Sequence, residues 1–342
     1  MSLFTPFAFY GGELWFPLTA SGGQLVIDSS SWDGGGQEGP YAYHVFTASG
    51  DFTVTDTGSD GYVEMFLVGG GGGGKSGGGG GGGIYQEYQY TVVSGSLTIT
   101  IGAGGTGGTG DTANNASGSD STISGSGFLT AISKGGGKAG PNNTLNNTVT
   151  SQGGSGGGGG AGGVAGQINL GGNAISGSLG TYQTKHGSPG GNAISGSTPV
   201  FAPAGGGGFS STGIINLDNV NGAGFGGEGS LIGSGVNSYW FGYISSASLG
   251  YSLGDPGGWF AGGGGGRRSD AEPTFVGRGG QGGGGNGNLG SGNGENGTAN
   301  TGGGGGGAAA GGTPGSGGSG ICIIRYRLTN NPFNPFLPST AP

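Results

Sequence analysis

Residues 63–90 read VEMFLVGGGGGGKSGGGGGGGIYQEYQY, which places two glycine blocks between two apolar runs and separates the blocks only by Lys75-Ser76. The flanking runs are rich in β-branched and aromatic residues, which is typical of β-strands. The blocks are not helical, because each glycine in a helix costs about 1 kcal/mol relative to alanine. Glycine also loses the most backbone entropy on folding. An ordered fold must therefore use these blocks for something that only glycine permits.

The rest of the chain repeats this alternation. It has 102 glycines among 342 residues, about four times the usual share of about 7%. A collagen triple helix is excluded, because glycine occurs in blocks instead of at every third position and the chain has only 14 prolines. Apolar residues make up 31% of the chain and gather in short runs. A packed core is therefore expected, besides the flexible linkers that glycine-rich tracts often form.

The apolar runs predict strands, because apolar and polar residues alternate along them with a period of two. The predicted strands are residues 41–46, 52–55, 62–68, 84–93, 96–101 and 321–328. The last of these is more than 250 residues from the first, yet loop closure becomes only slightly more costly with length. We therefore expect all of them in one β-sandwich, with Val45 and Tyr326 both buried.

The glycine blocks predict polyglycine-II helices. This conformation has three residues per turn and a rise of about 3.1 Å, and its backbone N–H and C=O groups point outward. Neighbouring chains can approach closely enough to bond to these groups only if they lack side chains. The blocks are residues 69–74, 77–83, 156–160, 205–208, 262–266, 282–285 and 302–307. Packed together they would form a bundle; the alternative is a set of flexible spacers.

Charge and cysteine content limit the partners. The net charge is −8, and no Lys or Arg precedes Lys75, which argues against a nucleic-acid surface. Cys322 is the only cysteine and lies in an apolar run, so we expect a buried small hydrophobe and no intrachain disulfide. Neither a secretory signal nor an apolar stretch long enough to span a membrane is recognisable. We expect synthesis in the cytoplasm and no membrane insertion.

Motifs for catalysis are weak. Gly69-x4-Gly74-Lys75-Ser76 formally matches the phosphate-binding loop, but that loop needs a helix to begin at its Lys-Ser pair, and Gly77–Gly83 follows instead. His44 lies in a predicted strand, where a core histidine is expected. No His/Cys or Asp spacing matches a zinc or calcium site. We therefore expect no nucleotide, cofactor or metal, and no enzymatic activity.

Four segments together resemble the glycine-rich domain of bacteriophage tail-fibre and virion proteins: residues 43–54, 63–74, 96–105 and 317–326. The same order of strands and glycine blocks is similar to the extracellular glycine-rich domain of the anaplastic lymphoma kinase receptor family. The resemblance implies an all-β protein with essentially no α-helix. Its fold would be a jelly-roll-like β-sandwich, similar to tumour-necrosis-factor-like domains, with an inserted polyglycine-II bundle. In the phage adhesins, loops at the distal end of the bundle bind the bacterial surface.

The resemblance covers about residues 41–328 and implies a division of the chain. The expected parts are an N-terminal assembly or attachment segment (1–40), the first strands of the sandwich (41–101), the glycine-rich bundle with exposed loops (102–320), the closing strand (321–328) and a C-terminal tail (329–342). The implied function is a non-enzymatic virion protein, most simply a tail-fibre or adhesin component. A structural fibre or decoration protein without a receptor role, and a cellular surface protein, remain as alternatives.

Candidate receptor-binding residues are those with large or cationic side chains in segments between glycine blocks. They are Tyr182, Lys185, His186, Tyr239, Trp240, Tyr243, Trp259, Arg267 and Arg268. The aromatic residues could pack against a receptor or could cap the bundle. The arginine pair could bind anionic lipopolysaccharide or could simply belong to a soluble turn. The expected partners are a host surface glycan or outer-membrane protein, other virion proteins, and further copies of the chain, for example in a homotrimer.

Overall fold

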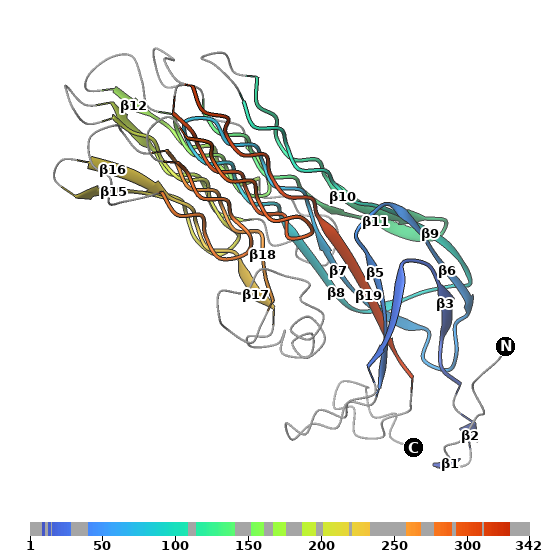
Figure 1. The fold of residues 1–342 in the computed structure, drawn as a ribbon. Coiled ribbons are helices and arrows are strands. Elements are labelled where there is room, and N and C mark those ends of the chain that lie inside the picture. Colours follow the sequence, from blue (N-terminus) through green and yellow to red (C-terminus); the bar gives the residue numbers. More distant parts are fainter. Residues whose placement is uncertain are drawn as a thin grey trace.

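The computed structural model describes the parts of the chain that form the sandwich and most of the glycine segments. These parts are residues 9–10, 13–14, 16–28, 40–108, 114–140, 152–160, 167–175, 187–195, 201–218, 221–232, 258–267, 277–288, 292–309 and 311–328. Within them the regular structure consists only of β-strands, most of them in antiparallel sheets. A β-sandwich lies at one end and a long bundle of glycine segments extends from it (Figure 1). The all-β prediction is confirmed.

Two five-stranded antiparallel sheets form the sandwich. The first has the order β4-β5-β19-β7-β8, with β4 at Gln24–Asp28, β5 at Tyr41–Phe46, β19 at Ile321–Arg327, β7 at Tyr62–Val68 and β8 at Ile84–Thr91. The second has the order β11-β10-β9-β6-β3, with β11 at Phe128–Ser133, β10 at Ser121–Gly125, β9 at Gly95–Thr100, β6 at Gly50–Asp56 and β3 at Thr19–Ser21. The strands predicted from periodicity thus appear within a few residues of their expected bounds.

Strand β19 confirms the predicted long-range pairing. It lies between β5 and β7, and its residue Ile323 faces Val45 on one side and Phe66 on the other. Val45 is 3% exposed and Tyr326 is 6% exposed. The C-terminal run therefore closes the sandwich that the N-terminal half begins.

The core lies between the sheets and continues onto the outer face of the first sheet. Phe52 and Ile99 from the second sheet pack against Met65 and Ile324 from the first. On the outer face, Phe66 is covered by Phe260, with the two ring centroids 5.1 Å apart. Strands β5 and β19 are consequently buried on both faces, which explains their near-continuous apolar sequences.

Two expected boundaries are wrong. Residues 1–40 were expected outside the sandwich, yet β3 and β4 are its edge strands. Residues 102–320 were expected to be bundle throughout, yet β10 and β11 belong to the second sheet. Edge strands bury less surface, so a short polar strand such as Thr19–Ser21 shows little of the alternation on which the prediction depended. The turn at Gly22-Gly23, where both φ angles are positive (116° and 58°), carries the chain from one sheet to the other.

Buried polar groups in the sandwich have partners. His44 is fully buried, with Nδ1 2.7 Å from the carbonyl oxygen of Gly22 and Nε2 3.3 Å from the hydroxyl of Tyr326. Burial lowers the pKa of His44 and raises the pKa of the buried Cys322 thiol. Both residues are therefore structural, as expected.

The glycine segments are joined by hydrogen bonds that repeat every three residues. Residues 69–74 donate their N–H groups, in chain order, to the carbonyls of Gly83, Ser119, Gly318, Gly80, Ala116 and Gly315. The first and fourth of these partners lie on one neighbouring segment, the second and fifth on another, and the third and sixth on a third. Three residues per turn is the repeat of polyglycine II. The dihedral angles of polyglycine II stay a prediction.

The carbonyl groups of this segment follow the same rotation with three further neighbours. Residues 70–74 accept, in chain order, from the N–H groups of Gly136, Gly105, Gly305, Ala139 and Gly108. The central segment thus has six neighbours, three bonded through its donors and three through its acceptors. A Cβ atom on any of residues 69–74 would overlap a backbone carbonyl of a neighbour. Glycine is required there because the backbones themselves are in contact.

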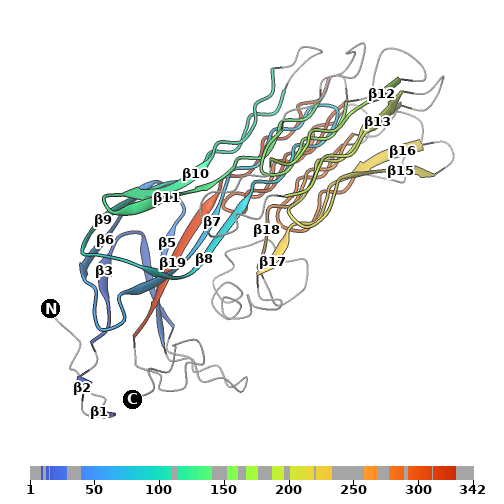
Figure 2. The same ribbon diagram turned by 180° about the vertical axis from the view of Figure 1, so that it is seen from behind.

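The remaining strands lie in the bundle or precede the sandwich. They are β1 (Phe9–Tyr10), β2 (Glu13–Leu14), β12 (Gln167–Asn169), β13 (Ala193–Ser195), β14 (Phe201–Ala202), β15 (Ile214–Asp218), β16 (Asn221–Phe225), β17 (Ser230–Ile232) and β18 (Gly258–Phe260). Figures 1 and 2 show β12, β15 and β16 at the end of the bundle opposite the sandwich, which we call the remote end.

Candidate recognition surface

The remote end is built from the tips of glycine segments. Strand β7 leads into residues 69–74, and residues 77–83 return to β8, so the Lys75-Ser76 turn lies at this end. Two other segments reach the same turn. The N–H of Arg267 donates to the carbonyl of Ser76 (2.8 Å), and the N–H of Ala308 donates to the carbonyl of Lys75 (2.7 Å). Arg267 and Lys75, almost 200 residues apart in sequence, are therefore neighbours in space.

The geometry of a phosphate-binding loop is absent at this turn. The N–H groups of Gly78, Gly79 and Gly80 donate to backbone carbonyls of three other segments, so they cannot cradle a phosphate. The Lys75 side chain is 2% exposed, with Nζ 3.4 Å from Oδ1 of Asn114. The resemblance of the motif to a phosphate-binding loop is therefore one of sequence only, and the absence of nucleotide binding stays a prediction.

Trp259 lies at the opposite end of the same glycine segment from Arg267. It is in β18 and pairs with Leu231 of β17. Its neighbour Phe260 packs against Phe66 on the outer face of the sandwich. The seven residue-to-residue steps from Phe260 to Arg267 would span about 22 Å at the polyglycine-II rise. The expectation that Trp259 and Arg267 share one recognition site is wrong, because Trp259 is held beside the sandwich.

The other predicted site residues fall outside the described part of the chain. They are Tyr182, Lys185, His186, Tyr239, Trp240, Tyr243 and Arg268. Their receptor-binding role stays a prediction.

Sequence reasoning missed two exposed apolar side chains near the remote end. Ile168 lies in β12 and Ile214 begins β15, and both are about half exposed. Ile168 lies between Gln167 and Asn169, and Ile214 opens the five-residue strand IINLD. Both runs are too short to show the periodicity on which the strand prediction depended. Arg278, which is also exposed, lies on a segment next to that of Arg267, where Gly280 donates to Gly263. The remote end thus carries exposed apolar and cationic side chains, and the exposed Glu295, whose carboxylate accepts a hydrogen bond from Asn286, adds an acidic group nearby.

The described residues contain neither a candidate metal site nor a candidate membrane span. No group of three or more His, Cys, Asp or Glu side chains in these parts of the chain is placed to hold a metal ion. Nor do the described residues form a helix long and apolar enough to cross a membrane.

The fold defines a class of protein in which a β-sandwich carries an inserted bundle of hydrogen-bonded glycine segments. A family model described as a glycine-rich domain matches residues 47–327, and the chain belongs to this family. No curated protein matches the chain. The match ends at the last residue of β19 and includes every glycine segment that the structure describes.

Proposed function

We propose that the protein is a non-enzymatic component of a bacteriophage virion, a tail-fibre or adhesin protein that binds the host surface through the remote end of its glycine bundle. Three features support this: the resemblance of four sequence segments to phage tail-fibre and virion proteins, the elongated arrangement, and the separation of the sandwich from the remote end. On this proposal the sandwich end contacts other virion proteins or further copies of the chain, as in a homotrimer.

The hydrogen-bonded interior of the bundle is the observation that carries the proposal. Inside it, segments such as 69–74 have no side chains and every described N–H group of this segment is bonded to a neighbour. Only residues at the turns and on the outer segments can contact a partner. A loop at the remote end can therefore change in sequence without disturbing the packing, which is what a recognition surface facing variable hosts requires.

Charge favours an anionic ligand at the remote end. The chain is acidic overall, yet Arg267 and the exposed Arg278 lie on adjacent segments there. Arginine binds phosphate and carboxylate groups through two parallel hydrogen bonds. A phosphorylated or acidic surface glycan, or an outer-membrane protein with acidic loops, fits this chemistry.

Substituting Arg267 tests the role of the remote end. Arg267→Ala keeps the backbone bond to Ser76 and removes the guanidinium, so we expect labelled protein to bind host cells at least about tenfold more weakly, as for other arginine anchors of interfaces. The matched control is Lys134→Ala, which removes an exposed cation beside the sandwich. The host strain is first identified by testing a panel of bacterial strains for binding of the wild-type protein.

Two results would count against the proposal. If both variants bound host cells equally well, the remote end would not be the recognition surface. A wild-type protein that binds no strain, together with variants that impair particle assembly, would favour the alternative of a structural fibre or decoration protein. A cellular surface protein would instead be found on the producing cell.

A further inference from the structure

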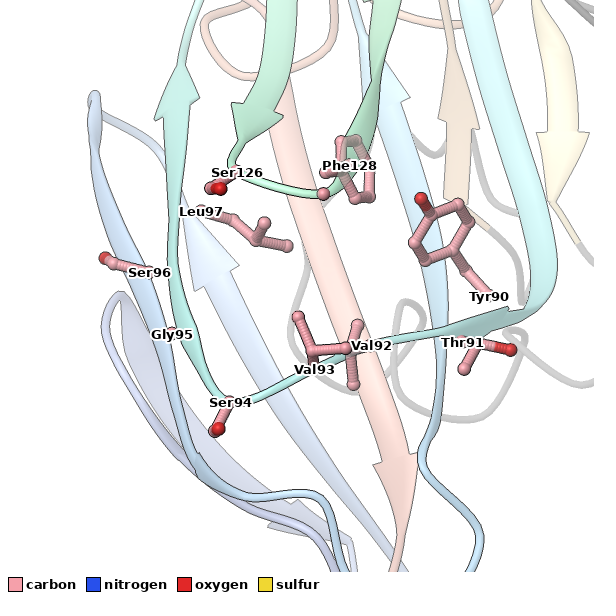
Figure 3. Close-up of a pocket in the computed structure, with 11 residues that line it drawn as sticks. Tyr90, Thr91, Val92, Val93, Ser94, Gly95, Ser96, Leu97, Ser126 and Phe128 are labelled. Carbon is pink, nitrogen blue, oxygen red and sulfur yellow. The ribbon is translucent and has the colours of Figure 1, made fainter.

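A small apolar pocket opens at the side of the sandwich, far from the remote end. It lies between the β8–β9 connection and the β10–β11 turn (Figure 3). Figure 3 shows Leu97, Val92, Tyr90 and Phe128 around the opening, whereas the hydroxyls of Ser94 and Ser96 point away from it. None of the described residues that line the pocket is charged. An uncharged, apolar group is therefore the occupant that it fits.

The size of the pocket matches one aromatic ring. Its volume is about 160 Å³, close to the roughly 150 Å³ of an engineered apolar cavity that binds benzene. The rings of Tyr90 and Phe128 already pair on one side, with centroids 4.5 Å apart. A third ring would extend this pair in the tilted geometry that aromatic side chains prefer. A phenylalanine side chain has the required size and shape.

The C-terminus of the sandwich lies close to this pocket. Strand β19 is separated from β8 only by β7. Arg325 pairs with Glu64 and Thr91 pairs with Tyr62, so the register brings the end of β19 level with Thr91. Two strand spacings amount to about 10 Å. Leu328, the last described residue, packs on the same core cluster as Tyr90 and Phe128.

The chain that follows Leu328 has the matching chemistry. Residues 329–342 read TNNPFNPFLPSTAP and contain no charged side chain but two Asn-Pro-Phe repeats. Phe333 is five residues beyond Leu328, a reach of up to about 17 Å. Proline restricts the backbone before each phenylalanine and so lowers the entropy lost on docking.

We propose that the pocket binds a phenylalanine of this C-terminal segment, Phe333 or Phe336, from the same chain. The pocket would then lock the tail against the side of the sandwich and set the direction in which residues 337–342 leave it. This inference is independent of the receptor-binding proposal, because it concerns the opposite end of the molecule.

Disulfide trapping in the full chain tests the proposal. Val93, at the mouth of the pocket, is 64% exposed, so we pair Val93→Cys with Asn334→Cys, which lies between the two phenylalanines. The matched control is Ile27→Cys with Asn334→Cys, because Ile27 is also exposed and lies two strands from β19 on the other side. The native Cys322 is buried and does not interfere. Crosslinks are quantified by mass spectrometry under mild oxidation.

We expect the Val93 pair to form an intramolecular disulfide at least about tenfold faster than the Ile27 pair, because docking raises the effective concentration of the tail cysteine. Adding Phe333→Ala and Phe336→Ala should reduce that rate to the level of the control without touching the folded sandwich. Equal rates for the two pairs, a preference that survives the loss of both phenylalanines, or a disulfide formed only between molecules would each overturn the proposal.

Discussion

Gly304→Ala is expected to destabilise the protein by about 4 kcal/mol or more, at the upper end of single-residue effects. The added Cβ would overlap the backbone carbonyl of Gly79, which cannot move aside as a flexible side chain could. Relief would require separating two segments, and Gly304 donates to Gly262 and accepts from Gly285 in the same lattice. Each buried N–H or C=O left without its partner costs about 1 to 3 kcal/mol. Gly158→Ala, which would meet the carbonyl of Ala204, should behave alike.

Gly50→Ala is the matched control for these substitutions. Gly50 begins β6, has no positive φ, and its added Cβ would lie 3.8 Å from the ring of Phe46, an ordinary contact. We expect a change within about 0.5 kcal/mol. Denaturant titration measures the free energy of unfolding of all three variants. Similar values for Gly50→Ala and Gly304→Ala would show that the bundle does not depend on direct backbone contact.

Glu64→Gln is expected to destabilise the sandwich by about 3 kcal/mol, because it leaves a buried cation without its counter-ion. The side chain of Arg325 is 1% exposed, with Nε 2.8 Å and Nη2 2.6 Å from the same carboxylate oxygen of Glu64. Its guanidinium also lies over the ring of Tyr41, 4.4 Å from the centroid. Burial alone would lower the pKa of Arg325, but Glu64, Tyr43 and Tyr41 raise it above its ordinary value. The arginine therefore stays charged and depends on Glu64.

An exposed ion pair provides the comparison for this effect. Lys134 and Asp120 are 2.7 Å apart, but both side chains are more than a third exposed. Lys134→Met should cost less than about 1 kcal/mol, as is usual for surface pairs. Thermal or denaturant unfolding compares the two variants. If Glu64→Gln were as mild as Lys134→Met, the Arg325 site would not be a stabilising element of the first sheet.

The sandwich could be predicted from local patterns because its central strands are strongly apolar. Strands β5, β7 and β19 bury both faces, and such runs stand out from the sequence between glycine blocks. Strands β3 and β4 were missed because edge strands need fewer apolar residues; Leu25 and Ile27 remain exposed even in the folded sheet. Strand β10 was hidden in a region whose composition is dominated by Gly and Ser.

The contacts within the bundle were beyond prediction from sequence. A glycine block has no side chains to specify its neighbours, so nothing in the sequence near Gly72 indicated Gly80 and Gly305 as its partners. For the same reason Arg267 could not be placed beside Ser76. Trp259 was grouped with the arginines because it is close in sequence, but seven residues of extended glycine segment separate the two ends of the bundle. Because such a segment is extended, residues that are far apart along it are also far apart in space.

The most direct test of the central claim is an experimental crystal structure that gives the backbone dihedral angles of residues 69–74 and 77–83. A polyglycine-II bundle should have φ near −75° and ψ near +145°, or the mirror-image pair that glycine also permits, with a repeat of three residues. Gly72 should then donate to Gly80, and residues 69–74 should contact six neighbouring segments. Pleated dihedral angles with a two-residue repeat and hydrogen bonds to only two neighbours would contradict the bundle and the recognition surface that depends on it.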